Sequence, residues 1–448
     1  MATSNVSTLI KNASIVNEGS ITVGDLRIED KHIAAIAPAL SARSGEQVVE
    51  AEGCWLLPGM IDDQVHFREP GLTYKGSLAT ESRAAVAGGI TSFMEMPNVD
   101  PATTNIANLE AKFSLAANSS VANYSFYLGA TPDNLEEIRK LDPARHCGVK
   151  IFMGASTGDL LVEDPVALEA IFREAPTLIT THCESGPVMA ANSREILKTK
   201  ERLTISDHPV VRDEDACFAS SDYAVGLAKR YGSQLHVLHL TTAKEMSLFE
   251  PGPVEGKAIT AEACVHHLWF TADDYDRLGN FIKCNPAIKY QNDRDALIDA
   301  LHTGKIDIIA TDHAPHTLDE KQQPYDGAPA GLPLVQHALP SLLDHVHHGR
   351  MSLEEIVEKT AHNPAKRYAV EARGFIREGY FADLVLIDPA QPYTVDTDNI
   401  LYKCGWSPFD GHTFSTSVKQ TWVNGTCVYN GTRVLDEVRS AMRLSFNR

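Results

Sequence analysis

Residues 62–71 read DDQVHFREPG and follow directly on the apolar run WLLPGMI at residues 55–61. Because side chains alternate along a strand, Gln64 and His66 share one face, and Arg68 follows on the same side. A buried strand that ends in an amide, an imidazole and a guanidinium is typical of the mouth of an active site in a barrel enzyme. On its own, the stretch fits an amphipathic edge strand with one hydrogen-bonded histidine equally well.

The composition is that of an ordinary globular chain. Its 448 residues are enough for a large barrel and a smaller domain. The apolar fraction of 43% and the charged fraction of 22% are unremarkable, but the formal net charge is -19. This charge makes nucleic acid and anionic membrane surfaces unfavourable partners. It does not exclude a small anionic substrate, because a local arginine or metal ion outweighs a distant field.

The cysteines and the N-terminus indicate a cellular compartment. The eight cysteines occur singly, without a Cys-x-x-Cys pair, which is typical of reduced thiols in a cytosolic enzyme. Residues 1–5 lack the basic and apolar regions of a secretory signal, and no apolar run approaches the roughly 20 residues that a membrane span requires. We therefore expect a soluble cytoplasmic protein, and we expect it to form a homodimer.

Short strand patterns occur at both ends of the chain. Neither end has enough strands for a core of its own, so we expect both to pair into one small β-sandwich domain, made by residues 1–55 and 373–448. The strand candidates are residues 8–10, 13–16, 21–23, 25–28 and 32–36 at one end and 383–388, 418–423 and 426–429 at the other. Asn424-Gly425 is expected to form the last hairpin turn.

Between these ends, residues 56–372 alternate between strand and helix patterns, which predicts an α/β fold with a (β/α)8 TIM-type barrel. The strand candidates are residues 56–61, 91–96, 124–128, 149–153, 177–181, 235–240, 258–264 and 306–310. The helix candidates are residues 78–87, 106–117, 134–141, 166–174, 214–231 and 294–301. A doubly wound open sheet is the structural alternative, but no Gly-x-Gly-x-x-Gly follows a strand to support it.

Side chains suited to zinc stand at the ends of four separate strand candidates: His66, His182, His239 and Asp312. A lone histidine is more often a packed residue, but barrel enzymes build their sites from these strand ends, so the set favours a metal site. His236 lies at an odd offset from His239, and we interpret it as structural. We interpret His266-His267 as packing at the barrel rim or as support for the ligands.

Lys150 stands in the middle of the apolar strand candidate 149–153. Burial of a bare ammonium group is costly, and it lowers the pKa of the lysine. A lysine that reaches the rim or pairs with a carboxylate would explain this residue without chemistry. A neutral amine inside the barrel is the functional alternative.

The segment HFREPG at residues 66–71 resembles the signature of dihydroorotases, which belong to the amidohydrolase superfamily with hydantoinases and allantoinases. Residues 149–156 and 311–316 resemble the other most specific parts of that family. The likeness runs over nearly the whole chain, including the use of both chain ends in one domain. The family usually has His-x-His in the first segment, and Gln64 replaces the first histidine here.

The resemblance implies that Lys150 carries a CO2-derived carbamate that bridges two metal ions. The ligands that it implies are His66, Lys150, His182, His239 and Asp312. A neutral amide such as Gln64 is a weaker zinc ligand than an imidazole. We therefore expect one tightly bound zinc ion, held by His182, His239 and the carbamate, and a second site of reduced affinity at His66, the carbamate and Asp312.

Further polar residues suit a small anionic cyclic amide. Arg68 presents a fork that binds a carboxylate through two hydrogen bonds. Asn98 and His316 resemble family residues that share this carboxylate, and Asn285 resembles a residue that contacts the pyrimidine ring. Ordinary turn chemistry next to Pro97 and Pro286 would explain the two asparagines equally well.

These residues together imply the activity of a dihydroorotase. Zinc would generate hydroxide near neutral pH, and Asp312 would take its proton and pass it to the leaving nitrogen. The reverse reaction closes N-carbamoyl-aspartate into dihydroorotate for pyrimidine synthesis. An allantoinase or hydantoinase is the nearest alternative, and Arg68 argues against both. A catalytically silent scaffold that supports a transcarbamoylase is the alternative from another class.

Overall fold

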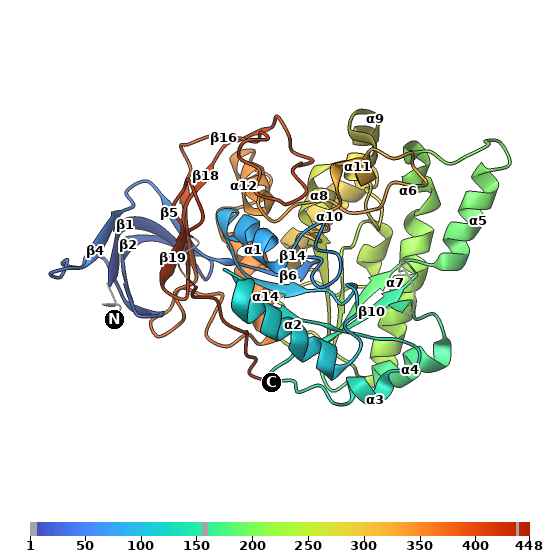
Figure 1. Cartoon of the computed structure of the whole chain (residues 1–448), viewed down its shortest axis with the longest axis horizontal. Helices are drawn as coiled ribbons and strands as arrows, with labels where there is room; N and C mark the ends of the chain where they lie inside the picture. Colours follow the sequence, from blue (N-terminus) through green and yellow to red (C-terminus); the bar gives the residue numbers. More distant parts are fainter. Residues whose placement is uncertain (1–6, 155–159, 436–438) are drawn as a thin grey trace.

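Parallel strands follow one another around the centre of the molecule (Figure 1). The computed structural model describes residues 7–154, 160–435 and 439–448. The strands are buried on both faces, as expected for a parallel sheet whose outer face is covered by helices. They are β6 (Met60–Val65), β7 (Ile90–Glu95), β8 (Asn123–Phe126), β9 (Leu128–Gly129), β10 (Val149–Met153), β11 (Ile179–Cys183), β12 (Leu235–Val237), β13 (Ile259–Cys264) and β14 (Ile308–Ala310).

Two hydrogen-bonded groups of strands make up the barrel. One has the order β6-β7-β8 and the other β14-β13-β12-β11-β10-β9, with β8 and β9 occupying one position on either side of Tyr127. The last strand closes on the first, because the amide of His66 donates to the carbonyl of His313 over 2.7 Å. The Thr311 hydroxyl also donates to Asp62 over 2.6 Å. The barrel therefore brings residues 62–68 against residues 311–316.

Helices between the strands cover the barrel (Figure 1). In the longest, α7, Asp213 accepts a hydrogen bond from the amide of Ala216 at the N-terminus, and Gly232 ends the helix with a φ of 70°. The helices are α1 (Leu78–Ala87), α2 (Ile106–Ser119), α3 (Leu135–Ile138), α4 (Pro165–Glu174), α5 (Gly186–Ile196), α6 (His208–Val211), α7 (Glu214–Tyr231), α8 (Val265–Trp269), α9 (Tyr275–Leu278), α10 (Gln291–Thr303), α11 (Leu318–Lys321), α12 (Ala338–His347), α13 (Leu353–Val357) and α14 (Asn363–Tyr368).

Both chain ends contribute to a separate β-rich domain, at the left of Figure 1. Its eight-stranded sheet has the order β19-β18-β15-β5-β1-β2-β3, with β4 also paired to β1. The strands are β1 (Thr8–Asn17), β2 (Ser20–Glu29), β3 (His32–Ala37), β4 (Gln47–Glu50), β5 (Trp55–Pro58), β15 (Leu384–Asp388), β18 (Ser417–Val423) and β19 (Thr426–Tyr429). A small ribbon, β16 (Tyr393–Thr394) and β17 (Thr413–Phe414), accompanies it. The domain has its own apolar core, in which Leu56 packs with Leu386 and Trp422.

This architecture confirms the predicted TIM-type barrel with a β-rich domain built from both chain ends. The predicted first barrel strand, residues 56–61, is wrong, because it divides at Gly59 into β5 of the β-rich domain and β6 of the barrel. A Cβ atom at Gly59 would lie 2.2 Å from the Thr91 side chain, so a glycine is needed where the chain passes between the two sheets. The division into domains that we propose at residues 55–56 and 372–373 therefore has its first boundary within β5.

Two other strands are shorter than predicted. The predicted strands 235–240 and 306–310 are reduced to β12 and β14, each with three residues. The backbone turns soon after both, with a φ of 39° at His239 and 51° at Asp312. The positive φ at His239 accounts for the early end of β12, whereas β14 ends at residue 310 as predicted and begins two residues late, at Ile308.

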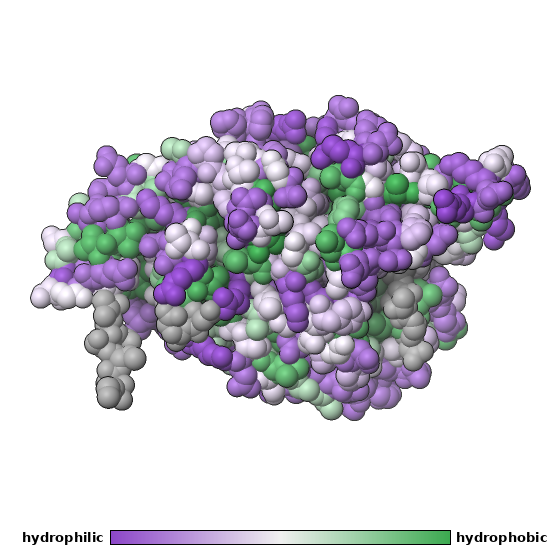
Figure 2. Space-filling model, turned by 45° about the horizontal axis from the view of Figure 1, so that its top comes forward, coloured by the Kyte–Doolittle hydropathy of each residue, from purple (hydrophilic) through white to green (hydrophobic). Residues whose placement is uncertain are grey.

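The surface and the helices agree with the composition. Among the described residues, none of the helices combines the length and the apolar character that a membrane crossing requires. Figure 2 shows a face that is mostly hydrophilic or intermediate, with apolar residues in separate patches.

Two hairpin turns of the β-rich domain allow a matched test of packing. Gly19 and Gly425 have nearly equal φ values, 74° and 76°, and each follows a residue with positive φ, as a type I′ turn requires. A Cβ atom at Gly19 would meet nothing within 4 Å, whereas one at Gly425 would lie 2.2 Å from the carbonyl oxygen of Asp30.

We expect Gly19→Ala to lower the free energy of unfolding by about 1 kcal/mol, from backbone strain alone. Gly425→Ala adds a clash with the backbone, which should cost roughly a further 1–3 kcal/mol. Urea unfolding of the two variants beside the parent chain measures both values. Equal losses would show that the turn of residues 424–425 does not pack against Asp30 as described.

Candidate functional site

A cavity of about 1030 Å³ opens at the C-terminal ends of the barrel strands, where barrel enzymes carry their active sites. Its wall includes every site residue predicted from the sequence. These are His66, Arg68, Asn98, Lys150, His182, His239, Asn285, Asp312 and His316, and Gln64 lies among them. The structure thus brings together residues from the C-terminal ends of five strands, Lys150 from within β10 and Asn285 from the loop that follows α9.

His66 and Asp312 meet across the closure of the barrel. The Nδ1 atom of His66 donates to the Asn98 side-chain carbonyl over 2.7 Å, so its lone pair is on Nε2. That nitrogen lies 3.1 Å from Oδ1 of Asp312. Two acceptors at this distance require a proton or a cation between them. Gln64 donates to the same carboxylate oxygen over 3.2 Å, so its amide nitrogen is directed at Asp312.

His182 and His239 form a second pair, with ring centroids 4.6 Å apart. Nε2 of His182 donates to Glu184 over 2.9 Å, which leaves the lone pair on Nδ1. Although burial alone would raise it, the pKa of Glu184 is lowered to about 2 by the Arg212 guanidinium and the His182 ring. The Nδ1 atom of His239 is buried and has no hydrogen-bond partner. An orphaned imidazole nitrogen beside a second neutral ring is a feature of a metal site.

The charge of Lys150 acts on the histidines of both pairs. Burial lowers its pKa to about 8, against the opposing effect of Asp312 and Glu262. Its ammonium group lies 4.6 Å from the centroid of the Phe152 ring. Burial also lowers the pKa values of the histidines at positions 66, 182 and 239, and the charge of Lys150 lowers each of them further. The lysine is therefore close to all three rings, and an appreciable fraction of its amine is neutral near pH 7.

Arg68 forms a buried cationic patch on the cavity wall. Its Nε atom donates to the Pro315 carbonyl over 3.1 Å, and one terminal nitrogen lies 3.1 Å from Nε2 of His316. Burial lowers the pKa of Arg68 to about 10, so the guanidinium group stays charged at neutral pH. On the other side of His316, Lys75 donates to Nδ1 over 3.0 Å and pairs with Glu320 over 2.9 Å.

The remaining predicted residues line the same wall. Asn285 has a buried side-chain oxygen without a hydrogen-bond partner. Pro329, Ala330 and Gly331, from a segment rich in glycine and proline at residues 327–333, also face the cavity, and the Ala330 carbonyl accepts from His316 over 2.9 Å. Residues 155 and 156, at the end of the segment predicted to resemble the family's lysine strand, lie outside the described residues.

Backbone strain is concentrated at this cavity. The described residues include nine non-glycine positions with positive φ, and three of them are Arg68, His239 and Asp312. Such conformations cost of order 1–3 kcal/mol each and persist where surrounding structure holds them. Sequence patterns do not reveal them, because arginine does not favour a positive φ, and histidine and aspartate, although enriched there, adopt it at only a small fraction of their positions.

Two buried clusters lie outside the predicted ligand set. Within the described ranges, two groups of three side chains have ligand atoms within 4.8 Å of one another: Cys264, His266 and His267, and Asp63, His236 and Glu262. His236 is fully buried and does not line the cavity, in agreement with its interpretation as structural. Glu262 and Cys264 were missed, although their alternation in β13 with other buried residues placed them on the inner face.

Comparisons with known proteins agree with this geometry. The profile of the Amidohydrolase family matches residues 55–428. A dihydroorotase from Halobacterium salinarum is 34% identical over 415 residues, 92% of this chain and 94% of that protein. An allantoinase from Solibacter usitatus is 32% identical over 432 residues, 94% of this chain and 93% of that protein. The structure of an L-hydantoinase (dihydropyrimidinase) from Arthrobacter aurescens is similar with a TM-score of 0.92 at 28% identity, covering 98% of this chain and 99% of that one.

The contact between Glu184 and His182 predicts an effect on metal affinity. In Glu184→Gln, the ring loses a charged acceptor and its tautomer is held less firmly, so we expect a metal ion at this pair to bind about 10–100-fold more weakly. Competition with a chelator, followed by metal analysis of the protein, measures the change. Glu169→Gln is the control, because Glu169 pairs with Arg230 and Tyr231 outside the cavity. Equal retention in both variants would contradict the role of Glu184.

Proposed function

Because this chain is a cyclic-amide hydrolase of the amidohydrolase family, we propose that it is a dihydroorotase, which interconverts L-dihydroorotate and N-carbamoyl-L-aspartate in pyrimidine synthesis. The observation that carries this proposal is the buried guanidinium of Arg68 in the cavity wall. Dihydroorotate bears a carboxylate on its ring, whereas allantoin and hydantoin are uncharged. A buried cation without an anionic ligand is costly, so the site favours the charged ring.

The surroundings of Arg68 prepare it for a carboxylate. Its bond to the Pro315 carbonyl holds the plane of the guanidinium group, and a fixed fork suits bidentate binding. Asn98 and His316 line the cavity near this group, as expected for residues that share the same carboxylate. Asn285 offers an unpaired side-chain oxygen to a ring N–H. These four residues would orient the substrate.

The donor set fits zinc. Neutral imidazoles, a carboxylate and an oxygen anion are ligands that zinc prefers, and two lone pairs that meet at His66 and Asp312 require a positive charge between them. We propose that His182, His239 and a carbamate on Lys150 hold one ion tightly, and that His66, the carbamate and Asp312 hold a second with lower affinity. When bound, zinc polarises the amide carbonyl and acidifies the attacking water.

The carbamate requires a neutral amine, which Lys150 supplies. With a pKa of about 8 it is partly deprotonated near neutral pH. The free amine adds to CO2 and releases one proton, and the product is an anion. Carbamate formation thus replaces a buried cation with a buried anion, whose charge bound metal ions would neutralise.

Asp312 is placed to move protons. It accepts a proton from the attacking water and returns it to the ring nitrogen as the amide bond breaks. Contacts from Gln64 and His66 hold its Oδ1 atom. In the direction of ring closure the same carboxylate takes the proton from the carbamoyl nitrogen.

An allantoinase is the second candidate, because relatives with that name match almost as well as the dihydroorotases. The two activities differ in the need for a cation. A side-by-side assay with dihydroorotate, allantoin and hydantoin tests the proposal directly. Preference for either uncharged ring would overturn it.

We expect Arg68→Ala to lower kcat/KM for dihydroorotate by roughly 10–100-fold, the loss of a charge-assisted hydrogen bond. Arg68→Lys should recover only part of this loss, since an ammonium group cannot bind a carboxylate through a planar fork. Residual turnover of an uncharged ring such as hydantoin is the internal control, and it should change less. A uniform loss on all rings would show that Arg68 acts on the fold and not on the carboxylate.

We expect Asp312→Asn to lower kcat by about 10²–10⁴-fold, because an amide cannot accept and return the proton. Metal analysis of the variant should still find the tightly held ion, whose proposed ligands are elsewhere. Steady-state kinetics with dihydroorotate and metal analysis of the same preparation give both results. Near-normal turnover would rule out this role for Asp312.

A further inference from the structure

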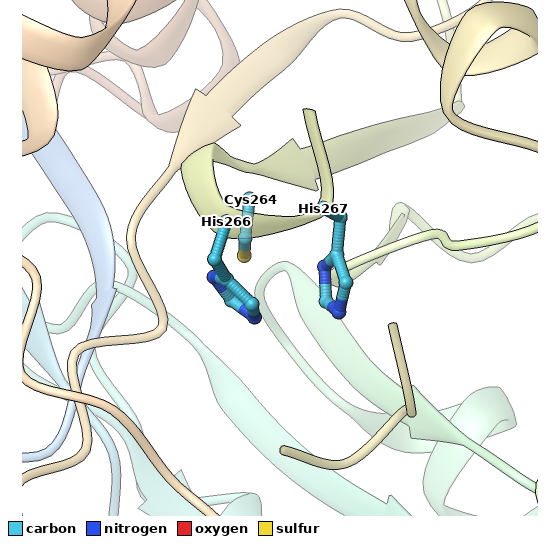
Figure 3. A group of neighbouring side chains, drawn as sticks. All are labelled: Cys264, His266 and His267. Atoms are coloured by element: carbon cyan, nitrogen blue, oxygen red, sulfur yellow. The ribbon is translucent and has the colours of Figure 1, made fainter. Parts of the chain in front are cut away.

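A second group of potential ligands lies beside Gln64 (Figure 3). Cys264 is the last residue of β13, and His266 and His267 are in the first turn of α8. Figure 3 shows the Cys264 sulfur next to the His266 ring, with the His267 ring facing it. Their ligand atoms lie within 4.8 Å of one another, and the three residues are at most 3% exposed. Neither histidine lines the main cavity.

Three of the four ring nitrogens in this group lack a hydrogen bond. Both ring nitrogens of His266 and Nδ1 of His267 are buried without a partner at full hydrogen-bond geometry, although the Thr311 backbone lies near the His266 ring. Only Nε2 of His267 is satisfied, by the Pro286 carbonyl at 3.1 Å. Buried polar atoms are nearly always paired, so three orphaned nitrogens in two adjacent rings indicate a missing ligand. Both rings are neutral because burial lowers their pKa values, which leaves lone pairs for a metal.

The other buried cluster provides a useful contrast. Both ring nitrogens of His236 are paired, with the Thr260 hydroxyl at 2.8 Å and with Glu262 at 3.2 Å. Despite its burial, the pKa of His236 is raised to about 9 by Asp63 and Glu262. In that cluster the ring of His236 is fully hydrogen-bonded and its charge is balanced by acidic neighbours, so no metal ion is needed. The Cys264 cluster has the opposite character, with neutral rings and open nitrogens.

The charges around Cys264 favour a cation. Its thiol lies among acidic groups, which with burial raise its pKa well above the usual value: Glu262, Asp312, Asp62 and Asp63. A thiolate can therefore exist here only with a positive charge beside it. A divalent ion provides that charge and is attracted by Asp63 and Asp312, whereas burial raises the pKa values of Asp62 and Glu262 to about 8 and keeps both mostly protonated near pH 7.

We propose that Cys264, His266 and His267 bind a borderline-soft divalent cation of the zinc type, in a site separate from the catalytic metal centre. One thiolate and two imidazoles suit zinc or cobalt and not magnesium or calcium, which require oxygen ligands. Cation binding at these residues does not depend on which cyclic amide the enzyme hydrolyses, so this proposal is independent of the proposed substrate.

Gln64 supplies the fourth ligand atom of this site, its side-chain oxygen. Its side-chain oxygen lies 3.7 Å from the Cys264 sulfur. In a tetrahedral zinc site, an oxygen and a sulfur ligand are about 3.6 Å apart, from bond lengths of about 2.1 and 2.3 Å. A cation held there would fix the amide, whose nitrogen donates to Asp312. Gln64 then connects the Cys264 site to the carboxylate of Asp312. This connection explains why an amide is present at a position where an imidazole would be the better ligand for the catalytic metal centre.

Cobalt tests the proposal because it reports thiolate ligands. The full chain, produced with cobalt as the added divalent metal, should show a thiolate-to-cobalt charge-transfer band in the near ultraviolet. The proposed catalytic ligands contain no sulfur and cannot produce it. We expect the band in the parent chain and its loss in Cys264→Ser, with one cobalt ion fewer per chain.

Cys54→Ser is the matched control, since Cys54 is also buried but belongs to the β-rich domain. It should keep both the band and the cobalt content. If Cys264→Ser does not fold, His266→Gln serves instead, and it should weaken cobalt binding and alter the band while the thiol remains. A parent chain that binds cobalt without the band would overturn the proposal, as would a band that persists in Cys264→Ser.

Discussion

The closure of the barrel between β14 and β6 is the contact on which the rest of the site depends. Asp62 accepts hydrogen bonds from the amide and the hydroxyl of Thr311 at 3.1 and 2.6 Å, and the His66 amide donates to His313. These bonds set the register of the first strand against the last. As a result Asp312 reaches Gln64, a residue 248 positions away in the sequence. A shift of one residue would turn every one of these side chains to the opposite face.

Burial then determines the chemistry of the groups that this closure brings together. Removal from water favours uncharged forms, so the histidines at positions 182 and 239 offer lone pairs at neutral pH, and so does the deprotonated fraction of the Lys150 amine. Groups with close partners of opposite charge keep theirs, as Glu184 does beside Arg212. The same low-polarity interior therefore yields neutral ligands and a charged orienting carboxylate.

Gln64 has contacts in two directions. Its amide nitrogen faces the carboxylate of Asp312, and its oxygen faces the thiol of Cys264. An imidazole that bound a metal ion through one nitrogen would keep only an N–H donor, whereas the amide offers a donor to Asp312 and an acceptor to Cys264. The glutamine, at a position where the dihydroorotase signature that this chain resembles has a histidine, thus affects the contacts behind the cavity wall as well as the wall itself.

The sequence by itself determined the barrel, the β-rich domain from both chain ends and the residues that surround the cavity. Periodicity and strand-end position carry that information, because a polar residue after a buried parallel strand must lie at one end of the barrel. Only the tertiary structure decided where β5 passes into β6, which histidines are hydrogen-bonded and which are not, and that Cys264 lies beside Gln64. These features depend on close approaches, as at Gly59, and on backbone conformations, as at Asp312, that arise from packing between distant segments. Local sequence patterns contain no record of such contacts.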